Sequence, residues 1–92
     1  MRAIQATDAQ WRIFEQILEE REHQDLLWGP TSHDLPFWMT ILLEELGEAA
    51  EAALADVTLE GEGSHHNLLI CRAELIQVAA VAMAAIEDID SK

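Results

Sequence analysis

The spacing of apolar residues predicts a first helix over about residues 8–27, capped by Thr7 or Asp8. Its apolar positions recur three and four residues apart, as on one face of a helix: Phe14, Ile17 and Leu18. The sequence Trp-Gly-Pro at 28–30 should end this helix, because Gly and Pro together break helices. A loop over 29–35 is expected to follow.

A second helix is predicted over about 36–57. Asp34 precedes it, and Pro36 suits its first turn because proline lacks the N–H that the first helical turn leaves unpaired. One apolar stripe is expected along this helix: Leu42, Leu46, Ala49 and Ala53, flanked by Ala50 and Leu54.

A polar break at 58–64 separates this helix from a third, over 65–88, for which Ser64 is the expected cap. Between 75 and 86 the third helix is apolar on every face except at Gln77. A helix of this kind must be buried on all sides, which two companion helices cannot achieve. Either the first helix breaks into shorter pieces, or, as we favour, a second subunit covers the third helix.

The composition agrees with one all-α domain over residues 1–92. Half of the residues are hydrophobic, with no Tyr and two Phe, so the apolar content is mostly Leu, Ile, Val and Ala. Two Pro and four Gly supply too few turns for an all-β fold. The fold class is therefore an all-α bundle of about three main helices per chain.

The chain is strongly acidic, with 18 Asp and Glu against five Lys and Arg and a net charge of −13. It should repel a nucleic-acid polymer and an anionic membrane surface, so neither is an expected partner. An anionic ligand would need a divalent cation as a bridge; alternatively, the acids only keep the protein in solution. The single Cys71 excludes an intramolecular disulfide, the N-terminus shows no signal segment, and the apolar stretch over 75–86 is short for a membrane span. A cytoplasmic protein is expected.

Two pairs of oxygen-bearing side chains suggest a metal site. Glu45 and Glu48 are one turn apart on the second helix, and Glu74 lies in an apolar stripe of the third helix, which it shares with Gln77. If the two helices pack antiparallel, these four side chains converge and suit Mg²⁺. The alternatives are a solvated acidic face on the second helix and, for Glu74, a core carboxylate that is paired with Arg or protonated.

These residues resemble the MazG-like, all-α nucleoside triphosphate pyrophosphatases. That family carries E-E-x-x-E followed by E-x-x-D; residues 44–48 match the first motif, and 74–77 match the second except that Gln77 stands at the aspartate position. The segment HQDLLWG at 23–29 also looks like this family. The resemblance covers roughly residues 20–88.

The resemblance implies hydrolysis of (deoxy)nucleoside triphosphates to the monophosphate and pyrophosphate. It implies Mg²⁺, or alternatively Mn²⁺, held by Glu45, Glu48 and Glu74, with Gln77 as the fourth ligand. It also implies a four-helix-bundle-like fold completed by dimerisation, as a homodimer or a dimer of dimers. Because an amide brings no charge, Gln77 should weaken Mg²⁺ binding without abolishing the site, since three anionic ligands remain. The alternative consequences are a different metal occupancy, slower turnover or a lapsed enzyme.

Further roles can be assigned to single residues. Glu44 is the candidate catalytic base, although the helical wheel points it away from the apolar stripe, so that it would act only at a site built partly by another subunit. A solvated Glu is the alternative. Trp28 offers a stacking face and Gln24 a hydrogen-bonding amide for the base of the substrate, whereas Trp11 and Trp38 are expected in the core.

Three functions follow from these features. The first is a nucleotide pyrophosphohydrolase, the second a catalytically weak or inactive oligomer that binds nucleotide with metal, and the third a structural domain with solubilising acids. Glu74 in an apolar face argues most against the third.

Overall fold

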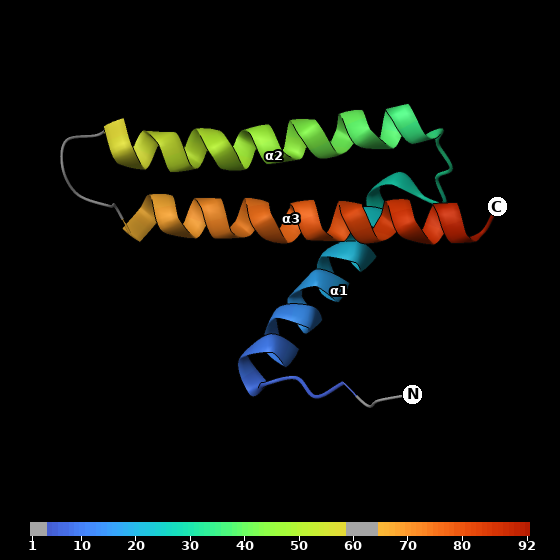
Figure 1. Cartoon of the computed structure of the whole chain (residues 1–92), viewed down its shortest axis with the longest axis horizontal. Helices are drawn as coiled ribbons and strands as arrows, with labels where there is room; N and C mark the ends of the chain where they lie inside the picture. The colour runs from blue at the N-terminus through green and yellow to red at the C-terminus, as the bar shows by residue number, and fades with distance from the viewer. Residues whose placement is uncertain (1–3, 59–64) are drawn as a thin grey trace.

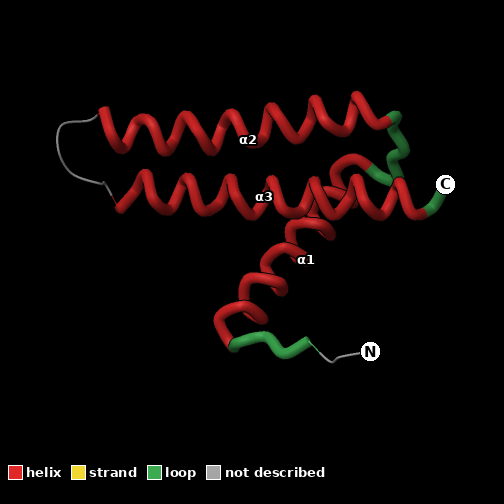
Figure 2. The backbone as a smooth tube through the Cα atoms, viewed as in Figure 1, coloured by secondary structure: helices red, strands yellow, loops and turns green. Residues whose placement is uncertain are grey.

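The computed structural model describes residues 4–58 and 65–92, and its described part is helical without strands. Three helices follow one another along the chain: α1 (Asp8–Trp28), α2 (Leu35–Thr58) and α3 (His65–Asp90) (Figure 2). The all-α prediction is confirmed, and each predicted helix end lies within about two residues of the observed one. The expected cap Ser64 and the break after Thr58 lie outside the described residues.

Local contacts explain where α1 begins and ends and where α2 begins. Thr7 caps α1: its Oγ1 accepts from the Gln10 N–H at 3.1 Å, while Gln10 Oε1 accepts from the Thr7 N–H at 2.9 Å. Gly29 ends α1 with φ +69°, a conformation that favours glycine. Asp34 Oδ1 accepts from the Phe37 N–H at 2.9 Å at the start of α2.

Helix α3 is the centre of the fold (Figure 1). Helix α2 runs antiparallel beside it, and α1 crosses α3 toward its C-terminal end, so that the beginning of α1 points away from the α2–α3 pair. The radius of gyration is 15.5 Å, whereas a compact domain of this length has about 12 Å. The single chain is therefore an open arrangement with little enclosed volume.

A small core lies where α2 meets the C-terminal half of α3. Trp38, Val81, Ala84 and Ala85 are buried there, with Ile41 and Leu42 packed against them. The prediction that Trp38 belongs to the core is confirmed. The same prediction for Trp11 is wrong within the chain, because Trp11 lies on the projecting end of α1 with 60% of its surface exposed.

The apolar stripe predicted for α2 is only partly the face that meets α3. Ala49 is buried as expected, but Leu46 and Leu54 are exposed. The observed inward face contains Trp38, Leu42, Glu45, Ala49 and Ala52, which are buried or half-buried. Beyond Glu45 this face presents the small residues Ala49 and Ala52, which let two helix backbones approach closely, whereas Trp38 and Leu42 fill the contact near the start of α2.

Helix α3 is not enclosed by this one chain. Ala80, Val81, Ala84 and Ala85 are buried, whereas Leu75, Met83 and Ile86 are exposed. The expected burial on all sides is therefore not achieved within the monomer. The first helix does not break into shorter pieces, since α1 is continuous from Asp8 to Trp28.

Among the described residues, α3 is the one helix long and apolar enough to cross a membrane. The helical segment His66–Asp90 contains an 18-residue stretch with a mean hydropathy of 1.8, and 22% of that stretch is buried in the chain. This stretch is longer than the one over 75–86 that the sequence pattern singled out. Much of the apolar surface of α3 is therefore exposed in the single chain.

Candidate metal centre

Three carboxylates from two helices converge at the middle of the α2–α3 pair. Glu45 and Glu48 come from successive turns of α2, and Glu74 comes from α3, which runs antiparallel. One carboxylate oxygen from each of the three lies within 4.8 Å of the other two. The structure thus brings together three of the four side chains that the sequence pattern assigned to a metal site.

The cluster contains buried oxygens without partners. Oε2 of Glu45 and Oε2 of Glu74 are inaccessible to solvent and make no hydrogen bond within the described part of the chain, whereas Glu48 is exposed. Leaving a buried acceptor unsatisfied costs about 1–3 kcal/mol. A hard divalent cation binds carboxylate oxygens and would satisfy both, so the donor set suits such an ion.

The electrostatic environment disfavours three charged carboxylates. Burial raises the pKa of Glu45, and the charge of Glu48 raises it further, followed by the charges of Glu20 and Glu44. Burial is also the largest cause of the raised pKa of Glu74, followed by a hydrogen bond with Glu48 and the charges of Glu48 and Glu45. Among the described residues, the charges that act on these two groups are all negative, so a cation or a proton would stabilise the cluster.

Gln77 lies one turn after Glu74 on α3 and is half-buried. Its amide oxygen is a neutral ligand type, so the four side chains predicted for the site comprise three carboxylates and one amide. Arg72, two residues before Glu74, is exposed.

A cavity of about 490 Å³ adjoins the cluster. Its walls combine aromatic side chains, two acids and smaller groups: Trp28, Thr31, His33, Phe37, Trp38, Ile41, Glu44 and Glu45. Glu45 belongs to both the cavity and the cluster. Glu44, which the sequence pattern assigned to a subunit interface, lines this cavity within one chain.

The aromatic wall of the cavity is continuous. The His33 ring lies 4.3 Å from the Phe37 ring and 4.9 Å from the Trp38 ring, measured between centroids. Trp28, at the end of α1, contributes a further aromatic surface with 53% of its area exposed. The cavity therefore offers flat apolar surfaces beside a group of carboxylates.

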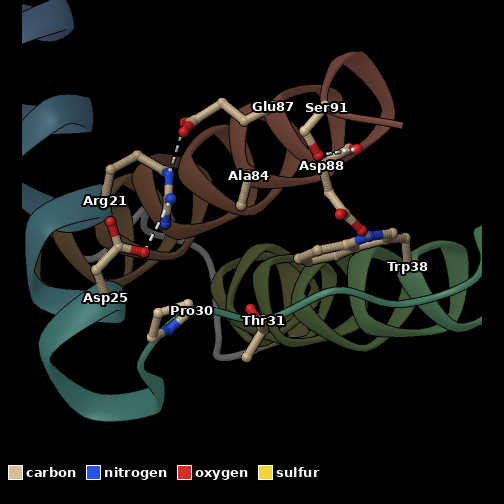
Figure 3. A pocket seen from close by; sticks show the side chains of 9 residues that line it. All are labelled: Arg21, Asp25, Pro30, Thr31, Trp38, Ala84, Glu87, Asp88 and Ser91. Carbon is tan, nitrogen blue, oxygen red and sulfur yellow. Dashed lines mark hydrogen bonds and ion pairs between the residues drawn. The ribbon is translucent and has the colours of Figure 1, made fainter.

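Gln24, the other predicted contact to the substrate base, is a buried residue of α1. Its Oε1 accepts from Arg21 Nη1 at 3.2 Å. Arg21 also contacts Asp25 at 2.9 Å and Glu87 at 3.1 Å, which joins α1 to α3 (Figure 3). The amide oxygen of Gln24 is thus used within the chain, and Gln24 is not among the residues that line the aromatic cavity.

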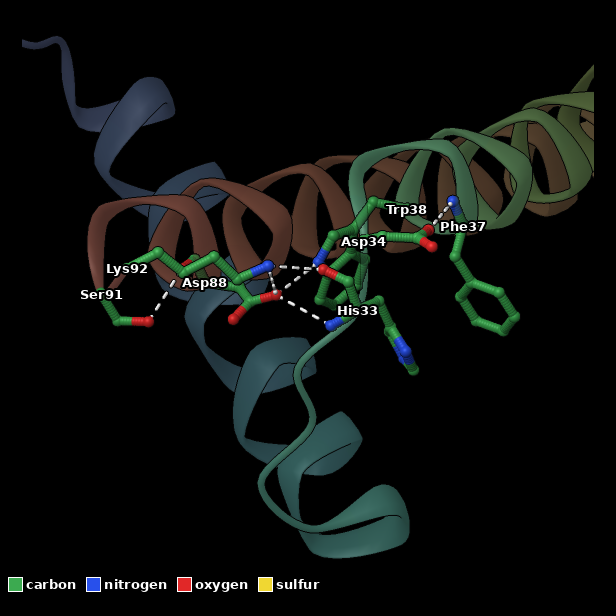
Figure 4. A network of polar contacts seen from close by, with 7 residues as sticks. All are labelled: His33, Asp34, Phe37, Trp38, Asp88, Ser91 and Lys92. Carbon is green, nitrogen blue, oxygen red and sulfur yellow. Dashed lines mark hydrogen bonds and ion pairs between the residues drawn. The ribbon is translucent and has the colours of Figure 1, made fainter.

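Sequence reasoning missed Asp88, a buried carboxylate at the end of α3. Its Oδ2 accepts from Trp38 Nε1 at 2.7 Å and from the His33 N–H at 3.0 Å, and lies 3.4 Å from Lys92 Nζ (Figure 4). These hydrogen bonds hold the pKa of Asp88 well below its usual range, and the bond from the His33 N–H has the largest effect. The available signal was its spacing: Asp88 follows the buried Ala84 by one helical turn.

Sequence reasoning also missed Glu20 on α1, whose charge acts on Glu45 although it belongs to neither motif.

No protein-family profile, no curated protein and no solved structure matches the chain. The geometry of the cluster and the adjoining cavity therefore supports the functional argument by itself.

Proposed function

We propose that this protein is a Mg²⁺-dependent nucleotide pyrophosphohydrolase of the MazG-like type, which converts (deoxy)nucleoside triphosphates to the monophosphate and pyrophosphate. The observation that carries the proposal is the cluster of Glu45, Glu48 and Glu74, in which one oxygen of each carboxylate lies within 4.8 Å of the others. In this cluster Glu45 and Glu74 each have a buried oxygen without a partner among the described residues. Such an arrangement is costly unless a cation compensates it.

Glu45, Glu48 and Glu74 would hold the metal, with Gln77 as a neutral fourth ligand. When bound, Mg²⁺ or Mn²⁺ would neutralise triphosphate charge and polarise the phosphate oxygens. This would also resolve the conflict between a protein of net charge −13 and a polyanionic substrate.

Glu44 is the carboxylate that we assign to proton transfer. It lines the cavity next to Glu45, so it can accept a proton from a water molecule that attacks the α-phosphorus while pyrophosphate leaves. Its neighbour Glu45 faces α3, so adjacent residues of one helix would divide the two tasks.

The aromatic cavity is the proposed binding site for the base. Trp28 and Phe37 present ring surfaces on which a base can stack, and stacking of this kind contributes about 1–3 kcal/mol per base. The base would then lie on one side of Glu44 and Glu45, and the phosphates near the three-glutamate cluster.

We further propose that other copies of this chain, as a homodimer or a dimer of dimers, cover the exposed apolar surface. An apolar groove of about 330 Å³ runs along α2 and is lined by Met39, Leu42, Leu43, Leu46 and Val78. Carboxylates within a bilayer are costly, and Glu74 and Asp88 both lie in the apolar helix α3. A second copy therefore suits this helix better than lipid, in agreement with a cytoplasmic protein.

Gln77 favours one alternative function. With only three carboxylates, the protein could bind a metal–nucleotide complex without turning it over, as an inactive oligomer. Both functions require the cluster, so they differ only in product formation.

The deciding experiment measures pyrophosphate release from the common ribo- and deoxynucleoside triphosphates with Mg²⁺. Wild type is compared with Glu48→Gln, and Glu51→Gln serves as the control because Glu51 is exposed one turn further along α2. Release that is lost in Glu48→Gln and retained in Glu51→Gln supports the enzyme. Metal-dependent nucleotide binding without release favours the binding protein, and neither binding nor release contradicts both.

A further inference from the structure

The end of α3 and Lys92, which follows it, hold the loop before α2 through the backbone N–H and the carbonyl oxygen of His33. The His33 N–H donates to Asp88 Oδ2 at 3.0 Å, and Lys92 Nζ donates to the His33 carbonyl oxygen at 2.6 Å (Figure 4). The same Asp88 oxygen accepts from Trp38 Nε1 at 2.7 Å. One carboxylate thus joins α3, the loop and the first turn of α2.

The two residues that Asp88 holds are walls of the aromatic cavity. His33 and Trp38 line it, and their rings contact each other. Asp88 itself lies behind Trp38, on the wall of a second cavity of about 370 Å³ that also contains Arg21 (Figure 3). Trp38 therefore separates the two cavities. Asp88 does not line the aromatic cavity and contacts it only through His33 and Trp38.

The hydrogen bonds to Asp88 restrict Trp38 to one orientation. The indole is almost fully buried, so turning it away would leave a buried N–H without an acceptor. Hydrogen bonds to a charged carboxylate are roughly twice as strong as those between neutral groups. The loop is fixed in the same way, because its His33 N–H has the same acceptor.

We infer that Asp88 is a positioning residue for ligand binding. It holds Trp38 and the loop over 29–34 in the arrangement that lets the cavity accept a flat aromatic ring beside Glu45. The inference rests on the proposed function, in which the ring is the base of a nucleotide. Asp88 does not touch that ring and takes no part in holding a metal.

The test compares Asp88→Asn with Asp90→Asn, the same substitution at an exposed position two residues on. One measurement is the exchange rate of the Trp38 indole proton by NMR. The other is the affinity for each of the four common deoxynucleoside monophosphates with EDTA present, so that the metal cluster does not contribute. A third is the shift in melting temperature on addition of Mg²⁺ alone.

We expect Asp88→Asn to speed exchange of the indole proton and to lower the affinity for the best-bound monophosphate by at least about fivefold. An asparagine keeps one oxygen for these donors but carries no charge, so both hydrogen bonds lose the strength that a charged acceptor gives them and the ion pair with Lys92 is lost. The Mg²⁺-induced shift should remain as in wild type, and Asp90→Asn should change none of the three.

Unchanged monophosphate affinity in Asp88→Asn, despite faster indole exchange, would overturn the inference, as would a wild-type protein that binds no monophosphate. Should Asp88→Asn not fold, Lys92→Met decides, because Lys92 is half exposed and holds the same loop: a loss of about two- to threefold supports the inference, and no loss overturns it. Binding without hydrolysis of any triphosphate would refute the pyrophosphohydrolase and leave the role of Asp88 intact.

Discussion

Glu45 and Glu74 face each other across the contact between α2 and α3, and each has one buried oxygen without a hydrogen-bond partner. Neither glutamate occupies a polar part of its helix contact: Ala49 lies one turn after Glu45, and Ala80 and Val81 are buried further along α3. The two carboxylates therefore oppose folding unless a ligand or a proton compensates them.

The first prediction concerns stability with metal. Mg²⁺ should raise the melting temperature of wild type by several degrees, because an ion that binds only the folded state stabilises it by mass action. Glu74→Gln should lose most of this shift, whereas Glu51→Gln should retain it. The measurement is a thermal melt in excess Mg²⁺ and in EDTA, and equal melting temperatures for wild type in the two buffers would contradict a carboxylate metal site.

The second prediction concerns pH without metal. The raised pKa values of Glu45 and Glu74 mean that the folded state binds more protons than the unfolded state from the usual glutamate range, about pH 4.5, upward to the raised values. The free energy of unfolding should therefore fall as the pH rises through this window. Denaturant unfolding in EDTA at about pH 5 and pH 8 tests this, and Glu45→Gln should flatten the dependence more than Glu51→Gln does.

The prediction on pH has a second part, because the lowered pKa of Asp88 changes stability in the opposite direction and in a separate pH range. This lowered pKa contributes stability above the usual aspartate range, about pH 4, and this stability is lost as the pH falls further. Acid unfolding of Asp88→Asn should consequently depend less on pH below about pH 4 than unfolding of wild type. The same pH dependence of unfolding in Asp88→Asn and wild type below about pH 4 would show that Asp88 is not charged and hydrogen-bonded in the folded protein.

The third prediction concerns the missing carboxylate. Gln77→Asp should lower the Mg²⁺ concentration that gives half-maximal activity or stabilisation by several-fold, since a fourth anionic ligand strengthens binding of a hard cation. The same variant should be less stable than wild type in EDTA, because a further charge joins the cluster. A titration in which Gln77→Asp needs as much Mg²⁺ as wild type would place residue 77 outside the metal site.

The fourth prediction compares two exposed tryptophans. Trp28→Ala should raise the KM for the preferred triphosphate by about tenfold, because Trp28 lines the aromatic cavity and stacking contributes about 1–3 kcal/mol. Trp11→Ala removes a similarly exposed indole from the far end of α1 and should leave KM unchanged. Equal effects of the two substitutions would show a general consequence of altering α1 and not a contact with the base.

The fifth prediction concerns assembly. Wild type at micromolar concentration should sediment as a dimer or tetramer, and Leu43→Glu should shift it toward monomer, because Leu43 is 70% exposed on the apolar groove of α2. Sedimentation velocity over a range of concentrations measures this. A monomeric wild type at about 100 µM would contradict the proposed oligomer.

The sequence was sufficient to predict the helices, because helix ends are local properties. It also predicted that Glu45 and Glu48 converge with Glu74, on the condition that the two helices pack antiparallel. It was insufficient for the face of α2 that meets α3, since alanines and leucines form two apolar faces and only packing against α3 selects one. Asp88 was missed for a related reason. Its partners His33 and Trp38 lie 55 and 50 residues away, and no local pattern reports such contacts.

The crossing of α1 over α3 has a consequence for how the molecule opens. Arg21 joins α1 to Glu87, 66 residues away, while much of α1 before it projects without cover. Amide protons of α1 should therefore exchange through a partial opening of lower free energy than those of α2 and α3. Such an opening would remove Trp28 from the aromatic cavity and leave Glu45, Glu48 and Glu74 assembled, so a base could enter or leave without dismantling the carboxylate cluster.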